Sequence, residues 1–131
     1  MNKEKLDLLK VYLKTNIAPI LIQDVDITFL KKDAVILPAN IKKPSLNGTL
    51  SSGKLNEPNW YNELKKRCQN GNGVLIISDL SKISKDEQSK FYEILKYRKV
   101  GVLELPKNCV ILLNGELDEL NDNIKSLVIT L

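Results

Sequence analysis

The stretch that decides the fold is Gly73-Val74-Leu75-Ile76-Ile77-Ser78-Asp79, in which four apolar residues stand between a glycine and a short polar pair. An apolar side chain at every position is typical of a parallel strand that is buried on both faces. Similar short apolar runs, separated by segments with helical spacing, predict βαβ units and a parallel sheet covered on both sides. The strands are expected at residues 19–23, 33–38, 74–77, 109–113 and 127–131.

Helices are indicated by apolar residues at helical spacing and by capping residues. Ser84 and Glu87 have the spacing of a capping box, in which each satisfies a backbone donor of the other. The helices are expected at 3–15, from about 57 to 68, from 84 onward and at 117–124, with a loop at 39–56 and a short extended segment at 100–105. The predicted core consists of Trp60, Leu64, Leu75, Ile77, Phe91, Leu95, Ile111 and Leu113.

Length and composition fit one globular domain over residues 1–131. The chain has 131 residues, of which 43% are hydrophobic and 27% are charged, enough apolar surface for one core. No apolar run approaches the roughly 18 residues that a membrane span requires. The first residues lead into an amphipathic pattern rather than a signal peptide, so we expect a cytoplasmic protein without membrane contact.

The absence of histidine excludes much enzyme chemistry. The sequence has no histidine and two cysteines, Cys68 and Cys109. It therefore offers no Ser-His-Asp triad and no imidazole acid or base, and two cysteines alone cannot complete a zinc site. In a cytoplasmic chain they are expected to be reduced, buried thiols. We expect no catalytic residue, no metal and no cofactor.

One segment imitates a phosphate-binding loop. Residues 48–55 spell most of the pattern G-x-x-x-x-G-K-[ST], but Leu55 stands where a hydroxyl should hold Mg²⁺. A working loop also runs directly from a buried strand into a helix. Here the preceding strand is expected to end ten residues earlier, near Leu37, and Pro58 places the next helix after Lys54. The segment is therefore interpreted as a surface loop.

The order of motifs from Gly48 to Asn114 resembles the core of AAA+ ATPases, most closely the MoxR-like branch. The matching residues are Pro58-Asn59-Trp60, the strand 73–77 with Ser78-Asp79-Leu80, Gln88 and Leu95 on the next helix, 97–100, Leu105-Pro106-Lys107-Asn108, and 110–113 with Asn114. The resemblance implies a three-layer α/β fold of the P-loop NTPase type. Its mostly parallel five-stranded sheet would have the order 5-1-4-3-2, and the helical lid of the family would be absent.

The departures from the family pattern imply that the ATP site is lost. After the first strand there is no glycine and no Gly-Lys-Ser/Thr, so the phosphate loop and its helix are expected to be deleted. The metal-orienting aspartate of the family aligns with Ser78 and its catalytic glutamate with Asp79, while Asn114 matches the sensor asparagine. With Asp24 after the first strand, these residues form a vestigial site at the carboxyl edge of the sheet, where α/β proteins bind ligands. An asparagine at a strand end also commonly bonds to its own turn.

These observations favour a non-hydrolysing AAA+-like module that acts in protein interaction or assembly. MoxR-like proteins, by resemblance, assemble into rings and remodel other proteins, so an active AAA+ relative or a shared client is the expected partner, and a homo-oligomer is possible.

Two alternatives remain open. Asp24, Asp26 and Asp79 loosely match the acidic Mg²⁺ site of phosphoacceptor receiver domains. The cluster Lys65-Lys66-Arg67, in a chain of net charge +4, allows weak nucleic-acid binding, although aromatic residues do not interleave with it.

Overall fold

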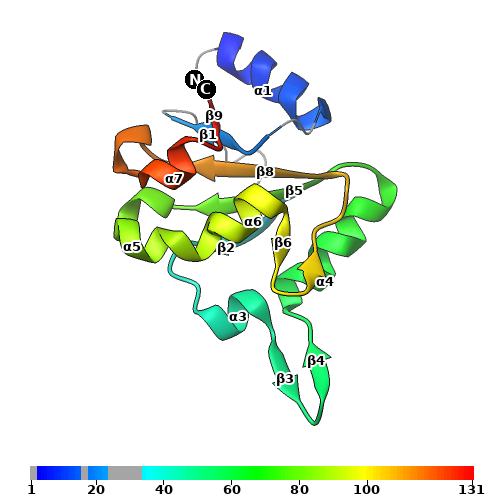
Figure 1. Cartoon of the computed structure of the whole chain (residues 1–131). Helices are drawn as coiled ribbons and strands as arrows, with labels where there is room; N and C mark the ends of the chain where they lie inside the picture. The colour runs from blue at the N-terminus through cyan, green and yellow to red at the C-terminus, as the bar shows by residue number, and fades with distance from the viewer. Residues whose placement is uncertain (1–2, 16–17, 24–33) are drawn as a thin grey trace.

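A five-stranded, fully parallel sheet forms the centre of the molecule (Figure 1). The computed structural model describes residues 3–15, 18–23 and 34–131. The strand order is β2-β5-β8-β1-β9, so the strands, numbered one to five along the chain, stand in the order 5-1-4-3-2 from the β9 side. The strands are β1 (Ile20–Ile22), β2 (Ala34–Pro38), β5 (Gly73–Ser78), β8 (Cys109–Asn114) and β9 (Ile129–Thr130).

Helices cover both faces of this sheet. Alternate strand residues point to opposite faces, so Leu75 and Ile77 of β5 join one apolar cluster while Ile76 joins the other. The larger cluster packs against α4 (Asn59–Arg67), α6 (Tyr92–Tyr97) and α7 (Asp122–Lys125), and the smaller one includes Leu9 of α1 (Lys3–Thr15). The chain therefore has three layers, and all eight predicted core residues are buried in the larger cluster.

The segment expected to be a loop, residues 39–56, carries regular structure instead. It contains the short helix α3 (Lys43–Asn47) and a hairpin of β3 (Thr49–Ser51) and β4 (Lys54–Asn56). Ser52 and Gly53 both have positive φ, 52° and 76°, as a tight hairpin turn with the twist of its strands requires. The indole of Trp60 donates a hydrogen bond of 3.0 Å to the carbonyl of Leu46. This contact holds α3 against α4, so tertiary packing fixes the helix.

The helix expected from residue 84 is divided into short pieces. The 3-10 turn η2 (Leu80–Lys82) precedes α5 (Lys85–Gln88), and η3 (Ser89–Phe91) leads into α6. The predicted cap is confirmed, because the Ser84 hydroxyl accepts a hydrogen bond of 3.2 Å from the Glu87 amide. Arg98 ends α6 with a φ of 57°.

The remaining short elements connect α4, α6 and β8. The turn η1 (Cys68–Asn70) follows α4, and η4 (Leu117–Glu119) lies between β8 and α7. The extended segment predicted at 100–105 is a small hairpin of β6 (Lys99–Val100) and β7 (Leu103–Glu104). The Arg98 guanidinium donates hydrogen bonds to the carbonyls of Pro106 and Cys109, which fastens this hairpin to β8. Among the described helices, none has the length and apolar character needed to cross a bilayer.

Candidate functional site at the carboxyl edge of the sheet

The fold brings three of the four predicted site residues together. Ser78 is the last residue of β5, Asp79 follows it, and Asn114 is the last residue of the neighbouring strand β8. The register places Ile77 beside Leu113 and Ile22 beside Asn114. Asn114 therefore lies between the ends of β1 and β5. Asp24, and Asp26 of the receiver alternative, lie outside the described residues.

The side chain of Asn114 is bonded to the neighbouring strand end. Its Oδ1 accepts a hydrogen bond of 3.1 Å from the amide of Asp79. Asp79 has a φ of 61°, a left-handed conformation that aspartate tolerates better than most residues. The expectation that Asn114 bonds to its own turn is wrong for this amide oxygen, because the turn after β5 offers an amide at the right distance.

The carboxylate of Asp79 is compensated by a lysine that the sequence analysis missed. Lys82 Nζ lies 3.6 Å from Asp79 Oδ1. Both side chains are more than half exposed, so the pair contributes little to stability. The two residues also line a pocket of about 400 Å³ at the ends of β2 and β5. Lys82 follows the strand by four positions within η2, which is why a search of residues directly after strands did not find it.

The loops at this edge are packed closely against one another. A Cβ at Gly115, whose φ is 149°, would lie 2.6 Å from the Ser81 hydroxyl, so the loop after β8 touches the loop after β5. Gln23, directly after β1, accepts a hydrogen bond of 2.9 Å from the amide of Leu117. The side-chain oxygens of Gln23 and Asn114 at this edge are thus both bonded to backbone amides.

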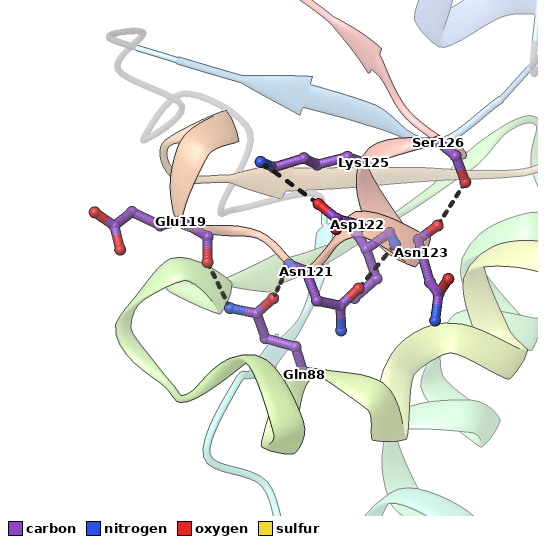
Figure 2. A network of polar contacts seen from close by, with 8 residues as sticks. Gln88, Glu119, Asn121, Asp122, Asn123, Lys125 and Ser126 are labelled. Carbon is purple, nitrogen blue, oxygen red and sulfur yellow. Dashed lines mark hydrogen bonds and ion pairs between the residues drawn. The ribbon is translucent and has the colours of Figure 1, made fainter.

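Gln88 joins the same two loops from beneath (Figure 2). It is fully buried, and its Nε2 donates to the carbonyls of Glu119 and Ile83 at 2.9 and 3.2 Å. Its Oε1 accepts from the amide of Asn121 at 2.8 Å. Both N–H groups and the oxygen of this amide side chain are therefore bonded to backbone.

Asn121 continues this network on the side of α7. Its side chain caps α7 by accepting a hydrogen bond of 2.9 Å from the Ile124 amide (Figure 2). It also donates a hydrogen bond of 3.0 Å to the carbonyl of Lys85. Segments 83–88 and 119–124 are consequently held as one unit. The sequence analysis used Gln88 only as a residue that matches the family pattern and did not predict its burial. Gln88 is three residues before Phe91 and seven before Leu95, which places it on the same apolar helix face, and this spacing could have indicated that it is buried.

The imitation of a phosphate loop is a surface hairpin. Residues 49–51 and 54–56 pair as β3 and β4, and the hairpin extends away from the sheet (Figure 1). Leu50 is 78% exposed. The segment does not join a strand of the central sheet to a helix N-terminus. The interpretation as a surface segment is therefore confirmed, whereas the expectation of an irregular loop was wrong, because these residues form a hairpin.

The strand order contradicts the receiver alternative. Receiver domains have the order 2-1-3-4-5, in which the first and third strands are neighbours. Here β8 lies between β1 and β5, so the ends of the first and third strands are separated by about 10 Å, two strand spacings. The ends of β1 and β5 are therefore not neighbours, as the ends of the corresponding strands are in a receiver domain.

The basic cluster on α4 is partly neutralised by acids. Lys65 Nζ lies 2.9 Å from a carboxylate oxygen of Glu57, and Arg67 Nε lies 3.4 Å from that of Glu63. Lys65 Nζ also stands 4.9 Å from the ring centroid of Tyr61. These contacts are typical of a solvated helix surface.

Both cysteines are free and buried, as expected. Burial raises the pKa of the Cys109 thiol to about 12 and also raises the pKa of Cys68. Because the thiolate is the reactive form, neither sulfur is activated as a nucleophile at neutral pH. In the described parts of the chain, no three cysteine or acidic side chains gather closely enough to hold a metal ion.

Comparison with known proteins supports the fold. No family model matches the chain, and no curated protein matches its sequence. Among solved structures, a point mutant of RuvB from Thermotoga maritima, an AAA+ ATPase, is similar with a TM-score of 0.53 and 10% sequence identity. The similarity covers 100% of this chain and 46% of the RuvB chain. The chain thus spans about half the length of RuvB, and it shares the α/β fold of an AAA+ P-loop core.

Proposed function

We propose that this chain is a degenerate AAA+-like core, most similar to the MoxR-like branch, that binds partner proteins and does not hydrolyse ATP. The carrying observation is that three polar residues at the carboxyl edge, Asp79, Lys82 and Asn114, bond to one another. Asn114 accepts from the Asp79 amide, and Asp79 pairs with Lys82. This edge is where a ligand of such a sheet would bind.

The requirements of a triphosphate support this proposal. ATP binding in P-loop enzymes needs backbone amides that cradle the phosphates, a lysine at the β- and γ-phosphates and a held Mg²⁺. Residues 23–33, which connect β1 to β2, contain no glycine and no Gly-Lys-Ser/Thr. Lys82, which lines the pocket at this edge, is paired with the Asp79 carboxylate. The missing loop motif and the paired lysine both support a chain that does not bind the triphosphate.

An AAA+-like fold that does not bind the triphosphate fits a role in the assembly of proteins. The resemblance to MoxR-like proteins makes an active AAA+ ATPase, or the client of one, the proposed partner, and it allows a second copy of the chain; nucleic acid is not proposed. This part is tested by mixing the purified chain with an AAA+ ATPase of the same organism and measuring the mass of the particles in solution; a complex heavier than either protein is expected, and two separate masses with every such ATPase would contradict this part.

The nucleotide part is tested by thermal unfolding of the whole chain with ATP and Mg²⁺, with ATP and EDTA, and with Mg²⁺ alone. A ligand present at one hundred times its Kd stabilises the folded state by about 2.7 kcal/mol, which moves the midpoint of a domain of this size by several degrees. We expect equal midpoints in all three conditions. A midpoint raised only by ATP with Mg²⁺ would contradict the proposal.

A further inference from the structure

The two cysteines lie close together although they are far apart in the sequence. Cys68 begins η1 at the end of α4, and Cys109 begins β8. Asn108 Nδ2 donates a hydrogen bond of 2.6 Å to the carbonyl of Cys68, so the residue before Cys109 contacts the backbone of Cys68. Both cysteine side chains belong to the larger apolar cluster and therefore lie on the same face of the sheet. The fold thus brings two thiols to one place.

Gly73 allows the sulfur of Cys68 to approach β8. Gly73 of β5 is paired with Cys109 of β8 in parallel register, and paired residues direct their side chains to the same face. A Cβ at Gly73 would overlap Cys68 Sγ, so this sulfur fills the place that a side chain beside Cys109 would otherwise take. Neighbouring strands lie about 4.8 Å apart, so Cys68 Sγ is roughly one strand spacing from the Cβ of Cys109.

This separation is close to the one that a disulfide requires, in which the two Cβ atoms lie about 3.5–4.5 Å apart. The Cys109 thiol donates a hydrogen bond to the carbonyl of Val110 that is long, at 3.9 Å, so little opposes its rotation toward Cys68. Rotations of the two side chains therefore bring the sulfurs together without a rearrangement of the strands.

The two thiols also act on each other electrostatically. Burial raises the pKa of both, and the charge of a Cys68 thiolate raises the pKa of Cys109 further, whereas the Arg98 guanidinium lowers the pKa of each. Thiolate is consequently a minor form of either residue at neutral pH, and any reaction of the pair is slow. Cys68 is 9% exposed and Cys109 is 0% exposed, so a small reagent reaches Cys68 first.

We propose that Cys68 and Cys109 are the two halves of a reversible disulfide that hydrogen peroxide closes in the folded chain. The Cys68 thiolate attacks one peroxide oxygen, the O–O bond breaks, and Cys68 becomes a sulfenic acid while hydroxide leaves and takes up the Cys68 proton as water. The Cys109 sulfur then attacks the Cys68 sulfur. The S–S bond forms, the S–O bond breaks, and the hydroxyl leaves with the Cys109 proton as a second water. The two thiols are oxidised by two electrons and the peroxide is reduced; a dithiol reverses the bond.

The bond would join the end of α4 to the start of β8. It would close a loop of the chain from residue 68 to residue 109, which contains β5 and the edge residues Ser78, Asp79 and Lys82. A disulfide that closes a long loop stabilises a protein mainly by restricting the unfolded chain. The oxidised chain should therefore resist denaturation more than the reduced chain. This device goes beyond the proposed function and requires neither a nucleotide nor a partner.

The test treats the whole folded chain with hydrogen peroxide and then counts free thiols by alkylation in denaturant. We expect two free thiols before treatment, none after it, and two again after dithiothreitol. Trypsin cleaves after lysine and arginine, so digestion without reductant should yield residues 68–82 joined to residues 108–125. The urea midpoint should rise on oxidation of the unmodified chain and should not rise in Cys109→Ala, which keeps Cys68 but has no second sulfur.

Four results would overturn the inference. These are two free thiols that survive the peroxide, cysteines that gain oxygen without a joined peptide, a disulfide between two chains, and an oxidised chain that unfolds at lower urea than the reduced one. If Cys109→Ala does not fold, the joined peptide and the midpoint of the unmodified chain decide. Failure of this test leaves the proposed function unchanged, and a thermal midpoint raised by ATP with Mg²⁺ removes that function without bearing on the disulfide.

Discussion

Replacing Gln88 by leucine should destabilise the protein through its backbone partners. Gln88 is fully buried, and its side chain bonds to the amide of Asn121 and the carbonyls of Ile83 and Glu119. Leucine has a similar size but no polar atoms. The Gln88→Leu variant therefore leaves one donor and two acceptors without these partners, and it weakens the connection between the segment after β5 and the segment after β8.

The expected loss follows from the burial of these groups. A buried donor or acceptor without a partner costs about 1–3 kcal/mol. Asn121 and Ile83 are half-buried and Glu119 is exposed, so water replaces part of the lost bonding. The apolar surface that leucine buries offsets a further part, roughly 1–2 kcal/mol. We expect the free energy of unfolding to fall by about 2–4 kcal/mol, the net of these terms.

Chemical denaturation measures this change, and amide hydrogen exchange locates it. In Gln88→Leu the amide of Asn121 should exchange much faster while amides within β5 and β8 keep their relative protection. Gln69→Leu is the matched control, because Gln69 is exposed in η1 and its replacement should change stability by less than about 0.5 kcal/mol. A Gln88→Leu variant as stable as the unmodified protein, with unchanged exchange at Asn121, would refute the reasoning.

Three further predictions concern single contacts. A Cβ at Gly73 would lie 2.4 Å from Cys68 Sγ, so Gly73→Ala should lower stability by about 1–3 kcal/mol. Adding Cys68→Ala to this variant should restore most of that loss. Chemical denaturation of the single and double variants checks this, and stability losses that simply add would contradict it. Asn114→Ala should remove about 0.5–1.5 kcal/mol and speed exchange of the Asp79 amide, whereas unchanged exchange would show that the bond is unimportant. The pKa of the Cys109 thiol is 9.0 in the unfolded chain and about 12 in the folded protein. The folded state therefore keeps this proton to higher pH, and the free energy of unfolding falls as pH rises from 9 to 12. Chemical denaturation of Cys109→Ala should show a shallower fall of the free energy of unfolding across that range, and an equal slope would contradict this prediction.

The central strands could be predicted from sequence because their apolar residues are continuous. Runs such as Leu75–Ile77 have no polar residue that could face water, and only a strand covered on both faces buries them all. The cap at Ser84 was predictable for a similar reason, since donor and acceptor are three residues apart. Local patterns therefore determined the layers of the fold.

The elements that were missed depend on contacts between distant residues. The helix α3 is held by Trp60, fourteen residues after Leu46 in the chain, and the hairpin β3–β4 was signalled only by the turn dipeptide Ser52-Gly53. At the site, the bond between Asn114 and Asp79 joins residues 35 positions apart. Sequence placed both residues at the edge of the sheet but did not show that they satisfy each other.

The central proposal is that this chain has an AAA+-like fold and does not bind the triphosphate of ATP. The most direct measurement compares ¹H–¹⁵N spectra of the whole chain with and without millimolar ATP and Mg²⁺, following the amides of Gln23, Ser78, Asp79 and Asn114. The account predicts that these four signals stay in place. Saturable shifts at these amides that vanish when Mg²⁺ is removed would contradict it.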